Sequence, residues 1–342
     1  MKALVTGATG FVGSHLVRSL LRRGDSVRIL AREAVKAAPL QADGVEVRLG
    51  DLGVRTSLTG IAEGVDVVFH LGSVMRGSAH DFERVDVRGT ERLLEEAQRA
   101  GVGRFVYAGT LAGYPPADTG TVIDERTPLD ETGQLGNYAL AKARCEKLVL
   151  AASNSGATDG VVVRLGLVCG VGANLFPPHV CKVIGRNWVI LFGDGRVPLP
   201  LTVVDNAVDA LVCAATVAGV AGQVFNIVDD DTLTQLDYLE LLRKCSAGVP
   251  HVLRLPLSAY YAIALASEIG AAARGKEPET TRYRIRCRSA RVQWDCSNAK
   301  RVLHWQPRVP LREGLVAAFP ASAAHRQTAD SSSGPAGARR SQ

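Results

Sequence analysis

The chain has 342 residues, of which 46% are hydrophobic and 22% are charged, and this balance is typical of a globular protein with a large core. Its formal net charge of +6 comes from 40 basic and 34 acidic residues that are scattered, apart from a basic run at 282–288, so nucleic-acid binding is not expected. The seven cysteines form no Cys-x-x-Cys pair and the seven histidines show no zinc-type spacing, which argues against a disulfide framework and a metal site and favours reduced thiols in the cytoplasm.

The N-terminus predicts a strand that turns at a glycine cluster into a helix. The apolar residues 3–5 precede Thr6-Gly7-Ala8-Thr9-Gly10-Phe11-Val12-Gly13, and an amphipathic stretch continues to residue 23. We expect Gly7 to permit the tight turn, Gly10 to let the backbone approach phosphates, and Gly13 to let the helix pack closely on the strand. The helix N-terminus offers N–H donors to an anion, so the sequence predicts a site for a dinucleotide pyrophosphate. Because the loop begins at residue 7, we expect no signal peptide before it.

Strand-like and helix-like stretches alternate with short connections along the first 165 residues. This alternation predicts βαβ units and an α/β fold with a doubly wound parallel sheet. The predicted strands lie at 3–5, 27–30, 45–49, 65–70, 104–108 and 160–165, and the predicted helices at 11–23, 54–62, 81–100 and 136–153. Beyond residue 165 the pattern loosens into loops, a helix at 205–217, a strand at 224–228 and a mostly helical remainder that includes an apolar stretch at 259–273.

The end of the second predicted strand bears on the choice between NAD and NADP. A carboxylate at that position would bind the ribose 2′-hydroxyl and repel a 2′-phosphate. The chain has Ala31 there, followed by Arg32, whose guanidinium suits a phosphate. The sequence therefore favours NADP over NAD, and an arginine that only faces solvent is the alternative.

A second candidate site combines a tyrosine, a lysine and a threonine. Tyr138 and Lys142 are four residues apart in a predicted helix, so their side chains share one face. A nearby ammonium favours the phenolate form of a tyrosine, which makes Tyr138 a candidate general acid/base. Thr110 follows the predicted strand at 104–108, at the sheet edge where α/β proteins bind ligands, and its hydroxyl suits a substrate oxygen. A chance Tyr–Lys spacing and a turn-capping threonine are the alternatives.

At this point the chain resembles the extended short-chain dehydrogenases/reductases, the NAD-dependent epimerase/dehydratase superfamily. The resemblance covers about residues 1–320 and rests on the glycine loop, Gly50-Asp51-Leu52, His70-Leu71-Gly72, Val87-Arg88-Gly89-Thr90, the segment 105–110 and Tyr138 to Lys142. It implies that Tyr138 is the catalytic acid/base, that Lys142 tunes it and binds the nicotinamide ribose, and that Thr110 is the catalytic hydroxyl. The implied cofactor-binding residues are Gly7, Thr9, Gly10, Phe11, Val12, Gly13, Arg32, Asp51, Leu52, Leu71, Gly72, Tyr138 and Lys142.

The resemblance also implies a division of the chain. Residues 1–165 are expected to form an NAD(P)-binding Rossmann domain to which residues 203–228 return. Residues 166–202 and 229–320 are expected to form a smaller, mostly helical substrate-binding part. Residues 321–342 are rich in Ser, Ala, Gly and Arg, and are predicted to be a disordered tail.

One residue departs from the family pattern. The family usually has Asn before the Val-x-Gly-Thr segment, whereas this chain has Asp86. An asparagine side chain both donates and accepts hydrogen bonds, but an ionised aspartate only accepts them. The usual local role of this position is therefore in question.

The C-terminal part of the sequence indicates which class of substrate is expected. The stretches 277–284, 294–300 and 307–314 resemble the ends of 3β-hydroxysteroid dehydrogenases, above all those that decarboxylate 4-carboxysterols. The Arg-Asp-Tyr/Phe run of many sugar-nucleotide enzymes is replaced by the apolar segment 197–201. We therefore expect an enzyme that acts on the 3β-hydroxyl or 3-keto group of a sterol-like lipid, with C4 decarboxylation where a 4-carboxylate is present. A sugar-nucleotide epimerase or dehydratase is the alternative, which Asn174-Leu175 favours.

These expectations extend to the surroundings of the site. A sterol needs a mostly apolar pocket, so we expect an apolar cleft beside Tyr138 walled by 198–201 and 259–273. The second of these stretches could equally be a buried core helix or a surface that contacts a membrane. No run of 18 uncharged apolar residues is present, so a spanning helix is not expected. The family resemblance implies a homodimer formed through the helices at 81–100 and 136–153.

Overall fold

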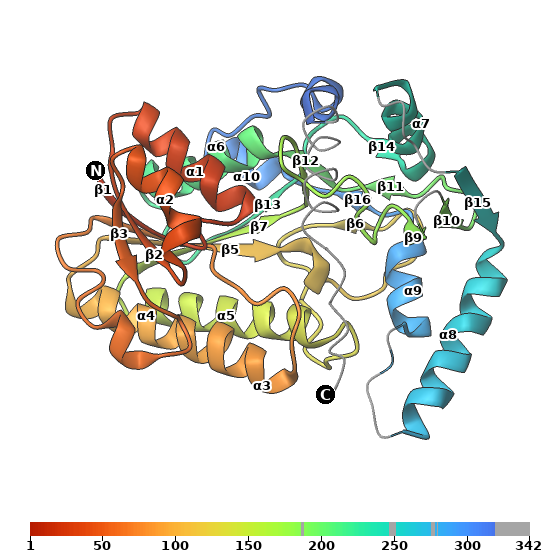
Figure 1. Ribbon diagram of the computed structural model, residues 1–342, viewed down its shortest axis with the longest axis horizontal. Coiled ribbons are helices and arrows are strands. Elements are labelled where there is room, and N and C mark those ends of the chain that lie inside the picture. Colours follow the sequence, from red (N-terminus) through yellow and green to blue (C-terminus); the bar gives the residue numbers. More distant parts are fainter. Residues whose placement is uncertain (186–187, 246–250, 275–277, 279, 319–342) are drawn as a thin grey trace, which may run out of the picture.

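The computed structural model describes residues 1–185, 188–245, 251–274, 278 and 280–318, and it is built on a seven-stranded parallel sheet (Figure 1). The strands, in spatial order, are β3 (Glu46–Leu49), β2 (Ser26–Ala31), β1 (Lys2–Thr6), β4 (Val67–His70), β5 (Arg104–Thr110), β7 (Asp159–Leu165) and β13 (Val224–Ile227). Every neighbouring pair is parallel, as in the β1–β4 register that places Thr6 opposite His70. The predicted doubly wound α/β sheet is confirmed.

Helices cover both faces of this sheet (Figure 1). One face carries α1 (Phe11–Arg22), α2 (Ala34–Ala42) and α6 (Val204–Thr216), and the other carries α4 (Arg88–Arg99) and α5 (Asn137–Asn154). Successive strand residues point to opposite faces, so Val5 shares a core with Leu16 of α1 while Leu4 shares one with Leu93 of α4. Both sets are fully buried, which explains why these strands read as continuous apolar runs.

Three expectations about the connections are wrong. The predicted helix at 54–62 is only a 3₁₀ turn, η1 (Arg55–Leu58). A helix missed by the sequence analysis, α2, joins β2 to β3; it contains Pro39 and buries only Ala37 and Leu40, so its apolar periodicity is weak. The predicted helix at 81–100 is divided into α3 (Ala79–Asp81), a π-helix η2 (Phe82–Val87) and α4. The other predicted strands and helices begin and end within two residues of the observed ones.

The second part of the molecule combines helices with four short sheets (Figure 1). One sheet has three strands, β9 (Lys182–Ile184), β10 (Trp188–Phe192) and β15 (His251–Leu255). The other three sheets are pairs of strands: β8 (Leu167–Cys169) with β12 (Leu201–Val203), β11 (Pro198–Leu199) with β14 (Leu233–Thr234), and β16 (Gln293–Trp294) with β6 (Val122–Ile123). Its helices are α7 (Gln235–Cys245), α8 (Leu257–Ala272), α9 (Arg282–Ser289) and α10 (Ser297–Val302). A third core cluster holds it together, including Leu191, Leu199 and Leu201.

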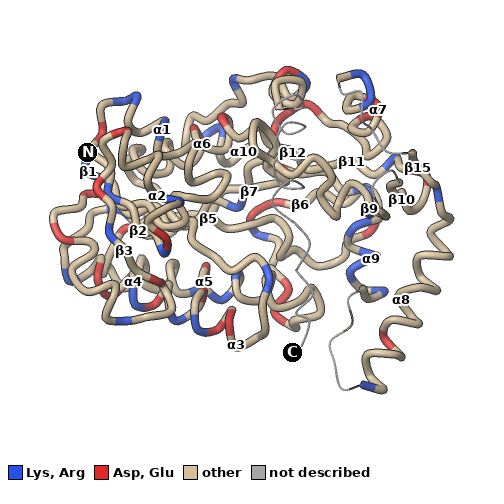
Figure 2. Tube along the Cα trace, viewed as in Figure 1, with Lys and Arg blue, Asp and Glu red and all other residues tan. Residues whose placement is uncertain are grey.

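Charged residues are spread over the whole trace (Figure 2). All seven cysteines are free thiols. Among the described helices, none is both long enough and apolar enough to cross a bilayer. In the described ranges, no three His, Cys, Asp or Glu side chains gather as a metal site would require. The predicted disordered tail at 321–342 lies outside the described residues.

Candidate active site and dinucleotide cradle

The glycine loop between β1 and α1 is packed too tightly for any side chain at two of its positions. Gly7 has φ +70°, and a Cβ added to it would lie 2.8 Å from the backbone nitrogen of Gly72. A Cβ added to Gly13 would lie 2.2 Å from the carbonyl oxygen of Gly7. The loop therefore needs glycine at both positions, for backbone conformation at the first and for close approach at the second.

The first turn of α1 is open to an anion. Gly10 is the N-cap residue, so no side chain caps the helix, and no acidic residue lies in its first turn. Thr9 and Gly10 are exposed, while Phe11 and Val12 are half-buried beside them. The first N–H groups and the positive end of the helix dipole therefore have no capping side chain, which suits a pyrophosphate.

A buried polar chain ties this loop to the next strand. The Gly72 N–H donates to Thr6 Oγ1 at 3.0 Å, and Thr6 Oγ1 lies 2.7 Å from His70 Nδ1. On the other side of the ring, His70 Nε2 lies 2.9 Å from Thr90 Oγ1, which donates to the carbonyl of Asp86 at 2.6 Å. Since the Thr90 hydroxyl hydrogen is used, His70 must donate through Nε2 and accept from Thr6 through Nδ1. Burial, assisted by the charge of Lys142, lowers the pKa of His70 to about 3, so the ring stays neutral.

The remaining predicted cofactor residues lie along the same edge of the sheet. Leu52 packs against Gly72, where an added Cβ would lie 2.7 Å from its Cδ1 atom. The Asp51 carboxylate accepts from the Gly53 N–H at 2.6 Å and thus shapes this turn. Arg32 follows the last residue of β2 and is exposed. The structure therefore gathers the glycine loop, Leu71–Gly72, Asp51–Leu52 and Arg32 around the carboxyl ends of β1, β2 and β4.

A buried lysine fixes the catalytic candidates against β5. Lys142 is 5% exposed; its Nζ donates to the carbonyl of Ala108 at 2.9 Å and lies 4.8 Å from the centroid of the Tyr107 ring. Tyr138, one turn earlier on α5, is half-buried with its ring edge-on to Phe82. Thr110 ends β5, and its Oγ1 accepts from the Ala112 N–H at 3.2 Å. Thr110 is thus a turn cap as well, and this bond leaves its hydroxyl hydrogen free to be donated.

Burial raises the pKa of three acidic groups near Lys142. Burial raises the pKa of Tyr107 well above its ordinary value, and it also raises the pKa of the Cys145 thiol. The pKa of Asp86 is raised by burial, against the hydrogen bonds that it accepts and the charge of Lys142. The ammonium of Lys142 is therefore a strong positive centre in a site with little water to screen it.

The structure answers the question raised by Asp86. Its carboxylate accepts from the Ser73 hydroxyl and from the Val74 N–H, the latter at 3.0 Å. Both partners are donors, so a group that only accepts hydrogen bonds satisfies this position. The sequence analysis missed the roles of His70, Thr90 and Ser73. The available signal was a polar residue, His70, at the end of an otherwise apolar strand.

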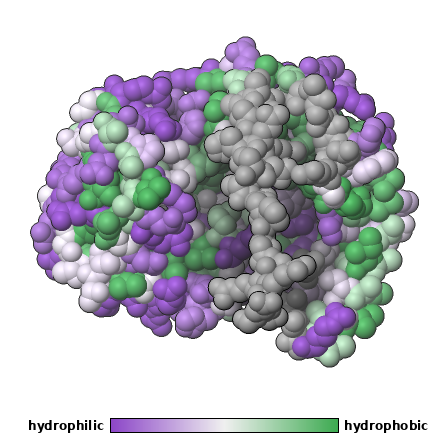
Figure 3. Space-filling view, in the orientation of Figure 1, coloured by the Kyte–Doolittle hydropathy of each residue, from purple (hydrophilic) through white to green (hydrophobic). Residues whose placement is uncertain are grey.

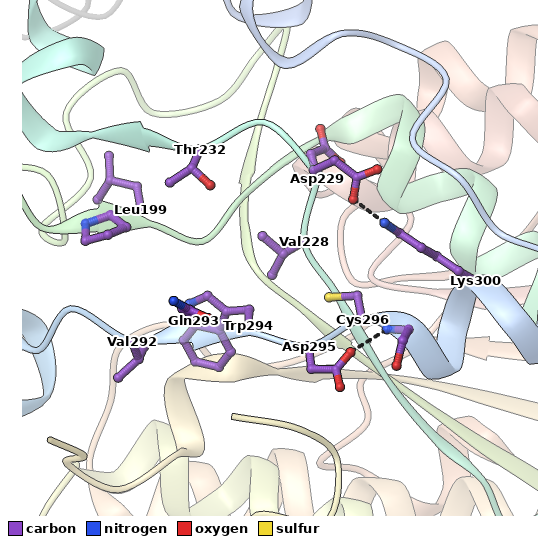
Figure 4. Close-up of a pocket in the computed structure, with 13 residues that line it drawn as sticks. Leu199, Val228, Asp229, Thr232, Val292, Gln293, Trp294, Asp295, Cys296 and Lys300 are labelled. Carbon is purple, nitrogen blue, oxygen red and sulfur yellow. Dashed lines mark hydrogen bonds and ion pairs between the residues drawn. The ribbon is translucent and has the colours of Figure 1, made fainter. Parts of the chain in front are cut away.

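One cavity of the described structure is separate from this site. It has a volume of about 370 Å³ and lies between β11, the segment after β13, β16 and the start of α10 (Figure 4). Pro198 and Leu199 line it, but Tyr138 and α8 do not. This cavity is therefore not the expected cleft beside Tyr138 with walls at 198–201 and 259–273; α8 contacts α9 and stacks Tyr260 on Phe192 of β10, and most of its residues are not buried.

Asp229 is an unusual group beside this cavity. Its Oδ2 accepts from the Val203 N–H and from Asn206 Nδ2, both at 2.9 Å, whereas its buried Oδ1 has no hydrogen-bond partner. Burial raises its pKa to about 6. The neighbouring Asp230 is ion-paired with Lys300.

Comparison with known proteins gives matches over most of the chain. A family model, the NAD dependent epimerase/dehydratase family, matches residues 3–228. The chain is 32% identical over 266 residues to the 4-hydroxy-2-methyl-3-oxo-4-farnesyl-3,4-dihydroquinoline-1-oxide ketoreductase of Stigmatella aurantiaca, which covers 77% of this chain and 79% of that protein. It is 28% identical over 343 residues to 3beta-hydroxysteroid-dehydrogenase/decarboxylase isoform 1 of Arabidopsis thaliana, which covers 91% of this chain and 77% of that protein.

One solved structure with the same fold is MoeE5 in complex with UDP-glucose and NAD. It superposes with a TM-score of 0.74 at 24% identity and covers 95% of this chain and 100% of its own. At this identity the likeness shows the fold alone.

The packing of the glycine loop predicts the effect of one added methyl group. Gly13→Ala should lower the free energy of unfolding by about 1–3 kcal/mol, because the backbone must move away from Gly7, and should weaken NAD(H) binding at the α1 N-terminus. Denaturant unfolding and calorimetric titration with NAD(H) measure both. Gly103→Ala is the matched control, since its Cβ would meet only Asp66 O at 3.7 Å. Wild-type stability and affinity in Gly13→Ala would show that the loop is not so constrained.

The raised pKa of Asp229 predicts a pH dependence of stability. Between the ordinary pKa of an aspartate and about 6, the folded state binds more protons than the unfolded state, so stability falls as pH rises through this window. Asp229→Asn keeps an acceptor for Val203 and removes the titration. The loss of unfolding free energy from about pH 4 to about pH 7 should shrink by roughly 1–3 kcal/mol in this variant. The exposed neighbour Asp231→Asn is the control, and equal pH profiles for all three proteins would contradict the assignment.

Proposed function

The chain belongs to the NAD-dependent epimerase/dehydratase family, and we propose that it oxidises the 3β-hydroxyl group of a sterol-like lipid, or reduces the corresponding 3-ketone. Its membership and its dehydrogenase-named relatives make it an NAD-dependent oxidoreductase with a Rossmann-type fold. The observation that carries the proposal is the hydrogen bond from Lys142 to the Ala108 carbonyl. It holds the face of α5 that bears Tyr138 against the strand that ends in Thr110.

The proposed chemistry assigns one task to each of these side chains. Tyr138 takes the proton of the 3-hydroxyl group, and Lys142, one turn further along α5, assists it. Thr110 donates its hydroxyl hydrogen to the substrate oxygen and fixes its position. The nicotinamide ring, when bound, supplies the acceptor for the hydride from C3. In the reverse direction, Tyr138 returns the proton to the oxygen of the 3-ketone.

A 4-carboxylate on the substrate would add a second step without a further catalytic group. Oxidation at C3 turns such a substrate into a β-keto acid, which loses carbon dioxide as the electrons of the C–C bond pass into an enolate. We assign Thr110 and the protonated Tyr138 as donors of hydrogen bonds to the enolate oxygen. We propose decarboxylation for substrates of this kind and simple alcohol oxidation for the others.

The burial of the apolar segment 197–201, which replaces the sugar-nucleotide motif, supports an apolar substrate. Leu199 and Leu201 are buried in the third core cluster, so this segment offers no charged group to a diphosphate. Two arginines in the C-terminal part are already occupied, Arg286 by Asp118 and Arg291 by Asp194. The names of the two relatives point the same way, since one acts on a farnesylated compound and the other on a hydroxysteroid.

The rival function is a sugar-nucleotide epimerase or dehydratase. Asn174-Leu175 favoured it, but in the structure the Asn174 side chain accepts from the Phe176 N–H at 3.0 Å and Leu175 is buried, so both residues serve the local turn. The likeness to the UDP-glucose complex is one of fold. Net production of NAD(P)H separates the two functions, because an epimerase returns the hydride within each turnover.

Removal of one hydroxyl group tests the catalytic proposal. Tyr138→Phe keeps the ring and its contact with Phe82 but cannot transfer a proton. We expect kcat to fall by about 10²-fold or more, with NAD(H) affinity nearly unchanged. Steady-state kinetics with a 3β-hydroxysterol and calorimetry with NAD(H) give the two values. Tyr261→Phe on α8 is the control, and wild-type turnover by Tyr138→Phe would show that the acid/base lies elsewhere.

We also propose that Arg32 favours NADP(H) over NAD(H). It is exposed at the end of β2 and no ion pair is found for it among the described residues, so its guanidinium is free to bind a 2′-phosphate. Arg32→Ala should weaken NADP(H) binding about tenfold or more while NAD(H) binding changes little. Arg22→Ala, at the far end of α1, is the control in calorimetric titrations. Equal losses for the two cofactors would reject this role.

A further inference from the structure

Helix α8 exposes a long face that carries no charge. Of its sixteen residues only Ala264 and Ala271 are buried. The exposed ones are Ser258, Ala262, Ile263, Leu265, Ala266, Ile269 and Ala272. The single charged residue of the helix, Glu268, is turned to α9, where it pairs with Arg282 at 2.8 Å. Helices at a water-exposed surface normally carry a polar face, so another apolar phase is expected to cover this one.

The apolar surface continues onto the sheet β9–β10–β15. Trp188 pairs with Ile184 on one side and with His251 on the other, and Leu253 is two residues further along β15, so these side chains share the outer face. Trp188 is 50% exposed, Ile184 45% and Leu253 43%. The rings of Phe192 in β10 and Tyr260 in α8 stack at 3.6 Å and join the sheet to the helix.

We define the α8 patch as Ile184, Trp188, Leu253, Ile263, Leu265 and Ile269. Seven of the 14 large exposed hydrophobic residues in the described part of the chain lie in β9, β10, β15 and α8, so the exposure is concentrated here. Hydrophobic side chains line the corresponding edge of the molecule in the space-filling view (Figure 3). A gathering of this kind on a folded protein marks an interaction surface.

Among the described residues, three exposed basic side chains surround the α8 patch. Lys182 in β9, Arg254 in β15 and Arg274 just beyond α8 are exposed, and within the described ranges none of them has an ion-pair partner. Figure 2 shows basic residues at both ends of α8, and the one acidic residue of this helix, Glu268, is ion-paired with Arg282. Within the part of the chain that the structure describes, these unpaired charges at the rim are therefore basic.

We propose that the α8 patch docks onto the surface of an anionic lipid bilayer. An uncharged helix face that lies flat in the interface, an amphipathic tryptophan and a basic rim are the features that such a surface recognises. A second copy of the chain fits less well, because a symmetric contact would bring the like-charged rims together. The proposal rests on this surface and does not depend on the substrate assigned to Tyr138.

Vesicle flotation with the full chain tests the proposal. The protein should float with vesicles of phosphatidylcholine and phosphatidylglycerol, bind pure phosphatidylcholine much more weakly, and lose binding as salt rises. Ile263→Ser with Ile269→Ser should abolish flotation, and Arg254→Gln with Arg274→Gln should lower the partition coefficient by about fivefold per arginine. Val35→Ser, at a hydrophobic residue 85% exposed on the far side of the molecule, is the matched control.

Several results would overturn it. These are no binding to either vesicle, equal binding by the wild type and both double variants, or a dimer in sedimentation velocity that Ile263→Ser with Ile269→Ser dissociates. The last outcome would make the patch an interface between copies. NAD(H) affinity verifies that each variant is folded. Turnover of a detergent-dispersed sterol should be unchanged in all of them, so a failed docking test leaves the proposed function standing and a failed turnover test leaves the docking standing.

Discussion

The buried ammonium of Lys142 is the constraint on which the site depends. Burying a charge costs free energy unless hydrogen bonds replace its water, and here the Ala108 carbonyl and the face of the Tyr107 ring do so. Both partners belong to β5, so the requirement for solvation fixes α5 on that strand. Neutral His70 and the buried carboxyl of Asp86, whose pKa is raised by burial, lie near this charge.

A polar chain near this charge connects the dinucleotide cradle to Asp86. The Thr6 hydroxyl accepts from the Gly72 N–H and donates to His70, His70 donates to Thr90, and Thr90 donates to the Asp86 carbonyl. Asp86 then fixes Ser73 and Val74 through its carboxylate. The loop after β4 is thereby attached at both ends, and the cofactor edge and the catalytic helix are positioned by one network. Such networks are fully effective only when every donor and acceptor is used, as they are here.

Local sequence signals predicted most of the architecture. The apolar strands and the glycine loop identified the sheet and its N-terminal cradle, because their patterns repeat over short distances. The short helix α2 was not predicted because its sequence has little apolar periodicity. The π-helix was not predicted because its wider turn does not change the apolar pattern of the sequence. His70 and Thr90 were missed as partners because their contacts with Thr6 and Asp86 depend on tertiary packing.

The position of α8 illustrates a different limit. Its apolar sequence is equally compatible with a core helix, a cleft wall or an exposed surface, and only the fold decides among them. The catalytic roles of Tyr138, Lys142 and Thr110 and the homodimer through α4 and α5 stay predictions. Many sugar-nucleotide enzymes have an arginine in the segment that corresponds to 197–201. In this chain Leu199 and Leu201 of that segment are buried, and this burial is the strongest structural support for an apolar substrate.

The central claim is that hydride leaves C3 of a sterol-like alcohol. It is tested most directly by turnover of a 4-carboxysterol that carries deuterium at C3, with NAD⁺ or NADP⁺ and mass spectrometry of both products. The account predicts deuterium in the reduced nicotinamide and a 3-ketone that has lost the carboxyl carbon. Retention of deuterium in an unchanged sterol, together with conversion of UDP-glucose without net formation of NAD(P)H, would contradict it.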